Sequence, residues 1–183
     1  MASVLVPLAE GCEELEAVTI LDLLVRAGIH VVSAGLREGP VTCSRGTVII
    51  PDLDLDSALK QEFDMIVLPG GLPGADHLDR DPRIRTLLLS MSASSKFIAA
   101  ICAAPKVLAS AGLLDNKQAT SYPGVIDTMD ITGLQYSTHA VVRDGTVITS
   151  RGPGTAMDFT LELIEILAGQ QKRHEVEAAL VRT

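Results

Sequence analysis

Short apolar runs of strand length alternate with longer segments of helical periodicity along the chain. The apolar runs are Ser3–Leu8, Ile29–Ala34, Asp64–Leu68, Phe97–Ile101 and Thr146–Ser150. The segments with helical periodicity are about 12–27, 54–60, 81–92, 105–111, 156–168 and 171–180. Strands that alternate with helices in this way predict an α/β fold with a mostly parallel sheet, sandwiched by helices.

Two antiparallel pairs interrupt this alternation. Residues 41–43 are compatible with pairing to 47–50, and residues 135–143 and 146–150 flank Asp144-Gly145, a typical hairpin turn. The remaining predictions are a short strand at 119–121, a loop or broken helix at 122–133, and a capping box in which Thr155 and Asp158 begin the helix at 156. The chain shows no linker or internal repeat, which predicts a single domain over residues 1–183.

The stretch around Cys102 carries the most specific chemical signal. A short apolar run, Phe97–Ile101, precedes Cys102, and Pro105 fits the first turn of a following helix. We interpret it as a buried strand, a sharp turn and a helix, although periodicity alone also allows a buried helix. The small residues on both sides of Cys102 resemble those of the sharp turn that raises a nucleophile above a sheet. Free backbone N–H groups at a helix start favour a thiolate. The alternative is a buried structural cysteine.

A carboxyl group is predicted to lie near this sulfur. On a helical wheel Glu16 shares a face with Ile20, Leu23 and Ala27, whereas the polar residues point elsewhere. A carboxyl group on the apolar face near the strand ends would be desolvated, which raises its pKa and lets it act as an acid or base. The alternative is that Glu16 turns into water at the start of its helix.

Pro69-Gly70-Gly71 follows a predicted buried strand and has two interpretations. Pro-Gly-Gly after a strand is most often only a turn. Alternatively, the N–H groups of Gly71 and Ala103, with Gly70 beside them, are backbone donors to an oxyanion. The glycines match neither the dinucleotide-binding spacing nor a phosphate-binding loop. The sequence therefore predicts no cofactor.

Composition and charge narrow the function classes. The net charge of −8 argues against a nucleic-acid partner. The chain lacks an apolar run of membrane-spanning length and a signal peptide. Three cysteines, Cys12, Cys43 and Cys102, form neither a disulfide framework nor a metal-binding spacing. These features predict a cytoplasmic protein without a bound metal.

Five segments together resemble the DJ-1/ThiJ/PfpI superfamily, closest to its ThiJ-like and DJ-1-like branch. They are Glu13–Glu16, Cys43–Arg45, Val67–Gly71, Ala99–Ala103 and Ser150–Thr155. The resemblance covers essentially the whole chain in order. It implies a flavodoxin-like, doubly wound fold similar to class I glutamine amidotransferases, and a homodimer.

The resemblance also implies roles for individual residues. Cys102 would be a low-pKa, oxidation-prone nucleophile with protonated Glu16 as its partner, and Gly71 and Ala103 would donate backbone hydrogen bonds. The residues implied for an anion-binding pocket near the dimer interface are Arg26 and Arg45, with Tyr122 and Pro153 as further pocket residues. Tyr122 replaces a histidine frequent in this branch, so base chemistry would fall to Glu16 alone.

Two functions are open at this point. One is an enzyme that acts on 2-oxoaldehydes, or on their adducts with proteins or nucleotides, as a glutathione-independent glyoxalase (glyoxalase III) or deglycase. The other is a redox sensor or oxidation-regulated chaperone of the stress response, which uses the same cysteine without turnover. Peptidase activity is not expected, because Ala103 stands where the protease branch carries a histidine.

Overall fold

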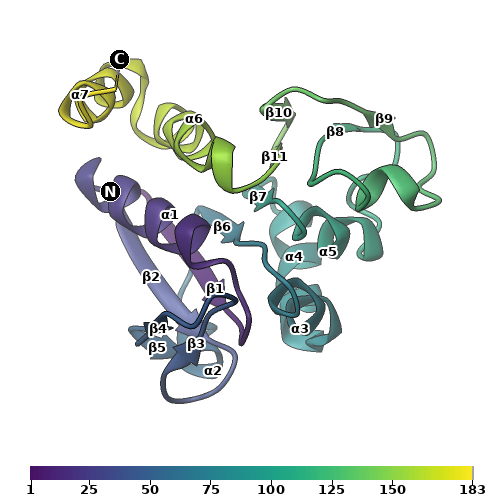
Figure 1. Ribbon diagram of the computed structural model, residues 1–183, viewed down its shortest axis with the longest axis horizontal. Helices are drawn as coiled ribbons and strands as arrows, with labels where there is room; N and C mark the ends of the chain where they lie inside the picture. Colours follow the sequence, from purple (N-terminus) through teal and green to yellow (C-terminus); the bar gives the residue numbers. More distant parts are fainter. Residues whose placement is uncertain (183) are drawn as a thin grey trace.

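A seven-stranded sheet forms the centre of the molecule in the computed structural model, which describes residues 1–182 (Figure 1). Its strand order is β10-β11-β7-β6-β1-β2-β5. The strands are β1 (Ser3–Leu8), β2 (His30–Gly35), β5 (Leu53–Asp54), β6 (Met65–Leu68), β7 (Phe97–Ile101), β10 (Val141–Asp144) and β11 (Val147–Ser150). All neighbours pair in parallel except β10 and β11, which form the predicted antiparallel hairpin.

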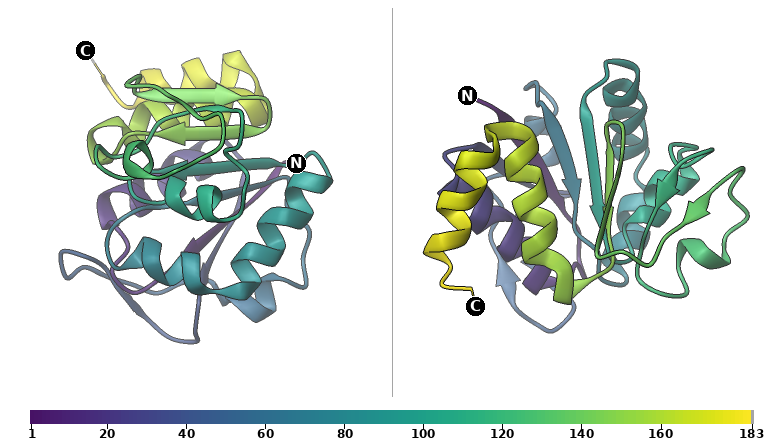
Figure 2. Two further views of the ribbon diagram at one scale, coloured as in Figure 1. Left: turned by 90° about the vertical axis from the view of Figure 1, so that its right-hand side faces the viewer. Right: turned by 90° about the horizontal axis from the view of Figure 1, so that it is seen from above.

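Helices cover both faces of this sheet. Figure 1 shows α1, α6 and α7 together on one side and α3, α4 and α5 on the other, and Figure 2 shows the same layers edge-on. The helices are α1 (Glu14–Arg26), α2 (Leu55–Ala58), α3 (Gly74–Arg80), α4 (Pro82–Ala93), α5 (Pro105–Ser110), α6 (Ala156–Ala168) and α7 (Gln170–Ala179). This arrangement confirms the predicted flavodoxin-like α/β fold with a mostly parallel sheet.

The alternation of side chains along β1 explains the two-sided core. Val4, Val6 and Leu8 pack into the cluster under α1 and α6, whereas Leu5 packs into the cluster on the opposite face. Successive side chains of a strand point to opposite faces, so a central strand covered on both sides must be apolar throughout. The unbroken apolar runs in the sequence therefore mark the central strands.

Smaller elements lie outside the main sheet. The excursion predicted near residues 41–50 is confirmed as an antiparallel pair. A second small sheet is parallel, and the loop between its two strands contains one short 3-10 turn, whereas another 3-10 turn follows β11. These elements are β3 (Val41–Thr42), β4 (Val48–Ile49), β8 (Gln118–Ala119), β9 (Gln135–Tyr136), η1 (Ile126–Thr128) and η2 (Pro153–Thr155).

Three local predictions need correction. Helix α3 was not predicted, because its glycine and polar residues give it no clear apolar stripe. Residues 135–143 do not form one strand, because β9 pairs with β8 whereas β10 pairs with β11. The capping box at Thr155 and Asp158 is wrong. The Thr155 hydroxyl bonds to Ser150 and Gly152, and the Asp158 carboxylate pairs with Arg182.

The carboxyl ends of the parallel strands lie along one edge of the sheet, where ligands bind in open α/β folds. Strands β6, β7 and β11 are neighbours, so the loops that follow them meet at this edge. Across residues 1–182, no helix combines the length and apolarity needed to cross a bilayer.

Candidate active site

Cys102 lies in a sharp turn between β7 and α5, as predicted. Its φ of 64° is in the left-handed region, which costs a non-glycine residue on the order of 1–3 kcal/mol. Two backbone hydrogen bonds hold the turn: the Cys102 N–H donates to the Ser150 carbonyl at 2.9 Å, and the Cys102 carbonyl accepts from the Tyr122 N–H at 2.8 Å. The sulfur-bearing residue keeps 8% of its surface exposed, so it is enclosed but reachable.

The Glu16 side chain is fully buried on the apolar face of α1, as the helical wheel predicted. Its Oε2 accepts a hydrogen bond from the Gly70 N–H at 2.8 Å, and Oε1 has no hydrogen-bond partner among the described residues. Burial raises the pKa of Glu16 to about 7, although the Gly70 N–H and the Cys102 thiol each lower it. An unpaired buried oxygen is costly when charged, so the carboxyl group retains its proton nearly to neutral pH.

The pKa of Cys102 differs from the sequence-based prediction. Burial and the neighbouring Glu16 carboxylate raise the pKa of this thiol to about 12, whereas the N–H groups of Gly71 and Ala103 lower it. The prediction of a low pKa is therefore wrong for the state in which Glu16 is ionised, because two negative charges would then lie together. The two groups titrate as a pair, which loses one proton near neutral pH and the second only far above it.

Glycines bring the loop after β6 into direct contact with this pair. A Cβ atom on Gly70 would lie 2.7 Å from the Cys102 Cβ and 2.8 Å from the Ile101 carbonyl oxygen, so a side chain does not fit. Gly71 has a φ of +86°, and its N–H reaches the Cys102 sulfur together with that of Ala103. Gly70 is not a free oxyanion donor, because its N–H is committed to Glu16.

The Tyr122 ring and Gly152, the residue before Pro153, lie next to each other near Cys102. A Cβ on Gly152 would lie 3.2 Å from Cδ2 of the Tyr122 ring and 4.0 Å from the Cys102 sulfur. The Tyr122 side chain is half exposed. Sequence reasoning missed Gly152, whose missing side chain leaves room for the ring beside the sulfur, although Gly152 belongs to the Ser150–Thr155 segment.

A cavity of about 260 Å³ borders the residue after Cys102. Ala103 lines it together with Lys106 on the first turn of α5, and Lys106 forms an ion pair with Asp76 of α3. Sequence reasoning missed this lysine, although its position four residues after Cys102 indicates proximity. The other lining residues are Leu72, Gly124, Val125 and Met129.

The two predicted arginines are not brought to Cys102. Arg26 ends α1 and pairs with Asp22 at the surface. It follows Glu16 by ten positions, which places the two residues about 15 Å apart along the helix axis. The Arg45 side chain is exposed, and its backbone N–H donates to the Glu14 carboxylate. Their implied role in a pocket stays a prediction.

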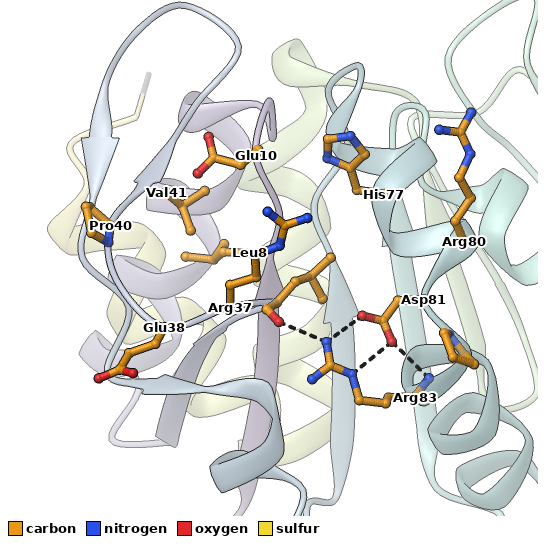
Figure 3. Close-up of a pocket in the computed structure, with 12 residues that line it drawn as sticks. Leu8, Glu10, Arg37, Glu38, Pro40, Val41, His77, Arg80, Asp81 and Arg83 are labelled. Atoms are coloured by element: carbon orange, nitrogen blue, oxygen red, sulfur yellow. Dashed lines mark hydrogen bonds and ion pairs between the residues drawn. The ribbon is translucent and has the colours of Figure 1, made fainter.

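A second cavity, of about 480 Å³, lies at the carboxyl ends of β1 and β2 and contains none of the predicted site residues (Figure 3). Arg83 on its wall is held by Asp81 and by the Leu36 carbonyl, and Arg37 and His77 approach from opposite sides (Figure 3). Cys102 and Glu16 supply the chemistry, so we place the candidate site there rather than in this second cavity. Among residues 1–182, no group of three or more His, Cys, Asp or Glu residues could hold a metal ion.

Comparison with known proteins decides the family. The model of the DJ-1/PfpI family matches residues 2–166, which is most of the chain. The chain belongs to the DJ-1/PfpI family. The sequence resemblance is thereby confirmed at the level of the family.

Individual relatives of the DJ-1/PfpI family match nearly the whole length of the chain. Protein dj-1beta of Drosophila melanogaster is 44% identical over 180 residues, covering 98% of this chain and 96% of the relative. Glutathione-independent glyoxalase DJR-1.2 of Caenorhabditis elegans is 39% identical over 175 residues, with 96% and 92% coverage. A solved structure of oxidized Toxoplasma gondii DJ-1 has a TM-score of 0.94 and 35% identity, and each chain is covered completely.

Proposed function

We propose that this protein is a glutathione-independent glyoxalase that converts 2-oxoaldehydes to 2-hydroxy acids, and that adducts of these aldehydes with proteins or nucleotides are its second substrate class. The observation that carries the proposal is the contact between the Cys102 thiol and the buried Glu16 carboxyl group. A nucleophile and an acid–base group are thereby combined without any cofactor motif. The name of the Caenorhabditis elegans relative supports the same substrate class.

The first step is addition of the thiol to the aldehyde carbon. Glu16, as carboxylate, takes the proton from the Cys102 sulfur while a bond forms between sulfur and C1. The aldehyde oxygen then accepts this proton from Glu16, which gives a hemithioacetal and returns Glu16 to the carboxylate. The N–H groups of Gly71 and Ala103, which reach the sulfur in the free protein, stabilise negative charge as it develops beside it.

The second step moves a proton between neighbouring carbons. Glu16 removes the hydrogen from C1 and returns it to C2, while the hydroxyl proton on C1 moves to the C2 oxygen, so the ketone becomes an alcohol and C1 becomes a thioester. Water then attacks the thioester, the carbon–sulfur bond breaks, and Cys102 regains its proton. A pKa of about 7 suits Glu16 to this exchange, because the group can both accept and donate a proton near neutral pH.

The test is lactate formation from methylglyoxal in the absence of glutathione. Cys102→Ser should lose essentially all activity, because the hydroxyl is a much weaker nucleophile than the thiol. Cys43→Ala is the matched control, since it removes a buried thiol that does not line the site, and under reducing conditions it should retain wild-type activity. Equal rates in the wild type and in Cys102→Ser would refute the proposal.

Redox sensing is the second candidate, because the same N–H groups would also stabilise an oxidised Cys102. The name of the oxidized Toxoplasma gondii structure supports this candidate. Mild peroxide treatment followed by mass spectrometry separates the two functions. Sulfinate confined to Cys102 without lactate formation supports sensing, whereas an unmodified Cys102 contradicts it.

A homodimer is the proposed assembly. Leu15, Val18 and Val25 lie along one stripe of α1 and are about half exposed, although they are apolar. A second copy would remove this stripe from water. Analytical ultracentrifugation at micromolar concentration should give a dimer mass, and Val18→Arg should shift it to the monomer. A monomer mass for the wild type would refute the dimer.

A further inference from the structure

A second pair of sulfur atoms lies outside the site described above. Cys12, in the loop before α1, and Cys43, in the loop after β3, have their Sγ atoms 3.5 Å apart. Both are free thiols, with 1% and 5% of their surfaces exposed. The sulfurs are 31 positions apart in sequence, and the proposed reaction uses neither of them.

Backbone hydrogen bonds hold the two cysteines in register. On one side, the Gly11 N–H donates to the Thr42 carbonyl at 2.8 Å. On the other, the Ser44 N–H donates to the Cys12 carbonyl at 2.8 Å. A disulfide needs an S–S distance of about 2.05 Å, so the sulfurs must approach by roughly 1.5 Å. Side-chain rotation can supply that approach because the backbones are already adjacent.

We propose that Cys12 and Cys43 form a reversible intrachain disulfide when the protein meets a hydroperoxide, and that this bond tightens the loop packed against Gly70 and Gly71. The proposal goes beyond the proposed function and does not depend on it. It makes the pair a modification site separate from Cys102.

The reaction balances with the hydroperoxide as the two-electron oxidant. One thiolate attacks the terminal peroxide oxygen, the O–O bond breaks, and a sulfenic acid forms with release of an alcohol, or of water when the oxidant is hydrogen peroxide. The second thiolate attacks the sulfenic sulfur, the S–S bond forms, and water leaves. The two thiols lose two protons and two electrons in total.

The surroundings of the pair make this bond slow to form and resistant to reduction. Burial is the main cause that raises the pKa of both thiols, and the Glu14 carboxylate raises each further. A scarce thiolate slows attack on peroxide. A disulfide is strongly oxidising when its reduced state is stabilised as a thiolate. The surroundings of Cys12 and Cys43 give no such stabilisation, so the disulfide should resist reduction.

The loop that carries Cys12 supports the glycines of the candidate site. The Glu13 N–H donates to the Gly70 carbonyl at 2.9 Å, and a Cβ on Gly71 would lie 2.3 Å from the Glu13 nitrogen and 2.7 Å from the Cys12 carbonyl carbon. Gly70 and Gly71 in turn contact Glu16 and Cys102. A bond between Cys12 and Cys43 would therefore restrict opening of the segment that supplies these N–H groups.

The first experiment uses Cys102→Ala, so that oxidation of Cys102 cannot obscure the result. After treatment with hydrogen peroxide and thiol blocking in denaturant, the intact protein should lack two hydrogen masses and carry no blocking groups. A linked peptide should join Cys12 to Cys43, and dithiothreitol should release it. Cys12→Ala in the same background is the matched control, and it should give no intrachain link.

The second experiment measures amide hydrogen exchange of the segment around Gly70 and Gly71 in Cys102→Ala. Exchange should slow by about fivefold or more on oxidation, and the Cys12→Ala control should show no such change. The proposal is overturned if peroxide leaves both thiols free, or adds oxygen to either one without a linked peptide. A linked peptide with unchanged exchange would overturn the coupling to the site. None of these readouts depends on glyoxalase activity, so the failure of either proposal is separately visible.

Discussion

The Cys102 turn and the Cys12–Cys43 pair are both buried thiol regions at the same edge of the sheet, but their electrostatic surroundings differ. Cys102 receives backbone N–H groups from two loops and contacts a carboxyl group whose pKa burial raises to about 7. In the Cys12–Cys43 pair each sulfur has the other as its partner, and the nearby Glu14 carboxylate raises the pKa of both thiols.

Glu14 shows this difference from the side of the acid. Burial opposes its ionisation, but its own backbone N–H and those of Arg45 and Thr47 lower the pKa of Glu14 to about 2. Glu16, two positions later on the same helix, has a single backbone donor and is fully buried. Burial of a thiol therefore does not define its chemistry; the donors and acids around it do.

The largest expected effect separates these two acids. Glu16→Gln should lower glyoxalase turnover by about 10²–10⁴-fold, because the amide cannot exchange a proton. Alkylation of Cys102 by iodoacetamide should set in only at strongly alkaline pH in the wild type, because burial and the Glu16 carboxylate raise the pKa of the thiol. In Glu16→Gln alkylation should set in at lower pH, because the negative charge beside the thiol is gone. Glu14→Gln should retain the wild-type profile, and an identical profile in Glu16→Gln would contradict the role of the pair.

A smaller effect concerns the pH dependence of stability. The pKa of Glu16 is raised from 4.5 to about 7 on folding, so the folded state binds the proton more tightly than the unfolded state. This contribution is fully present below pH 4.5 and is lost as pH rises to about 7, with a size of about 3 kcal/mol. The free energy of unfolding measured in urea should show this loss with rising pH in the wild type, and Glu16→Gln should not show it.

Glu14 should behave with the opposite sign. Its lowered pKa contributes stability above pH 4.5 that is lost as pH falls toward 2. The difference in the free energy of unfolding between the wild type and Glu14→Gln should therefore be smallest at acidic pH. If both variants changed the pH dependence in the same direction, the contrast between the two acids would be wrong.

The smallest effect compares the glycines behind the two thiol regions. A Cβ on Gly70 would meet Cys102, and one on Gly74 would lie 2.6 Å from the Cys12 nitrogen. Each alanine substitution should lower the free energy of unfolding by about 1–3 kcal/mol, because backbone must move. Gly154→Ala is the control: its Cβ would meet nothing within 4 Å, so the change should stay within about 0.5 kcal/mol. Equal stabilities for Gly70→Ala and Gly154→Ala would contradict the close approach.

Much of the fold follows from the sequence alone. The apolar runs of β1, β6 and β7 are continuous because these strands are covered on both faces, and that pattern is local. The segment of α3 could not be identified, because it packs through a few small and apolar residues and carries glycine and charged residues elsewhere. The break between β9 and β10 was also hidden, since alternation along a strand does not say which partner it pairs with.

The sequence by itself determined the α/β architecture, and it predicted the turn at Cys102 and the inward face of Glu16 as one of two interpretations each, because periodicity and turn chemistry are properties of neighbouring residues. Tertiary structure alone decided that the Gly70 N–H binds Glu16, that Gly152 leaves room beside Cys102, and that the sulfurs of Cys12 and Cys43 meet. These contacts join residues far apart in the chain. The register of the sheet and the packing of its loops set their distances, and no local pattern encodes them.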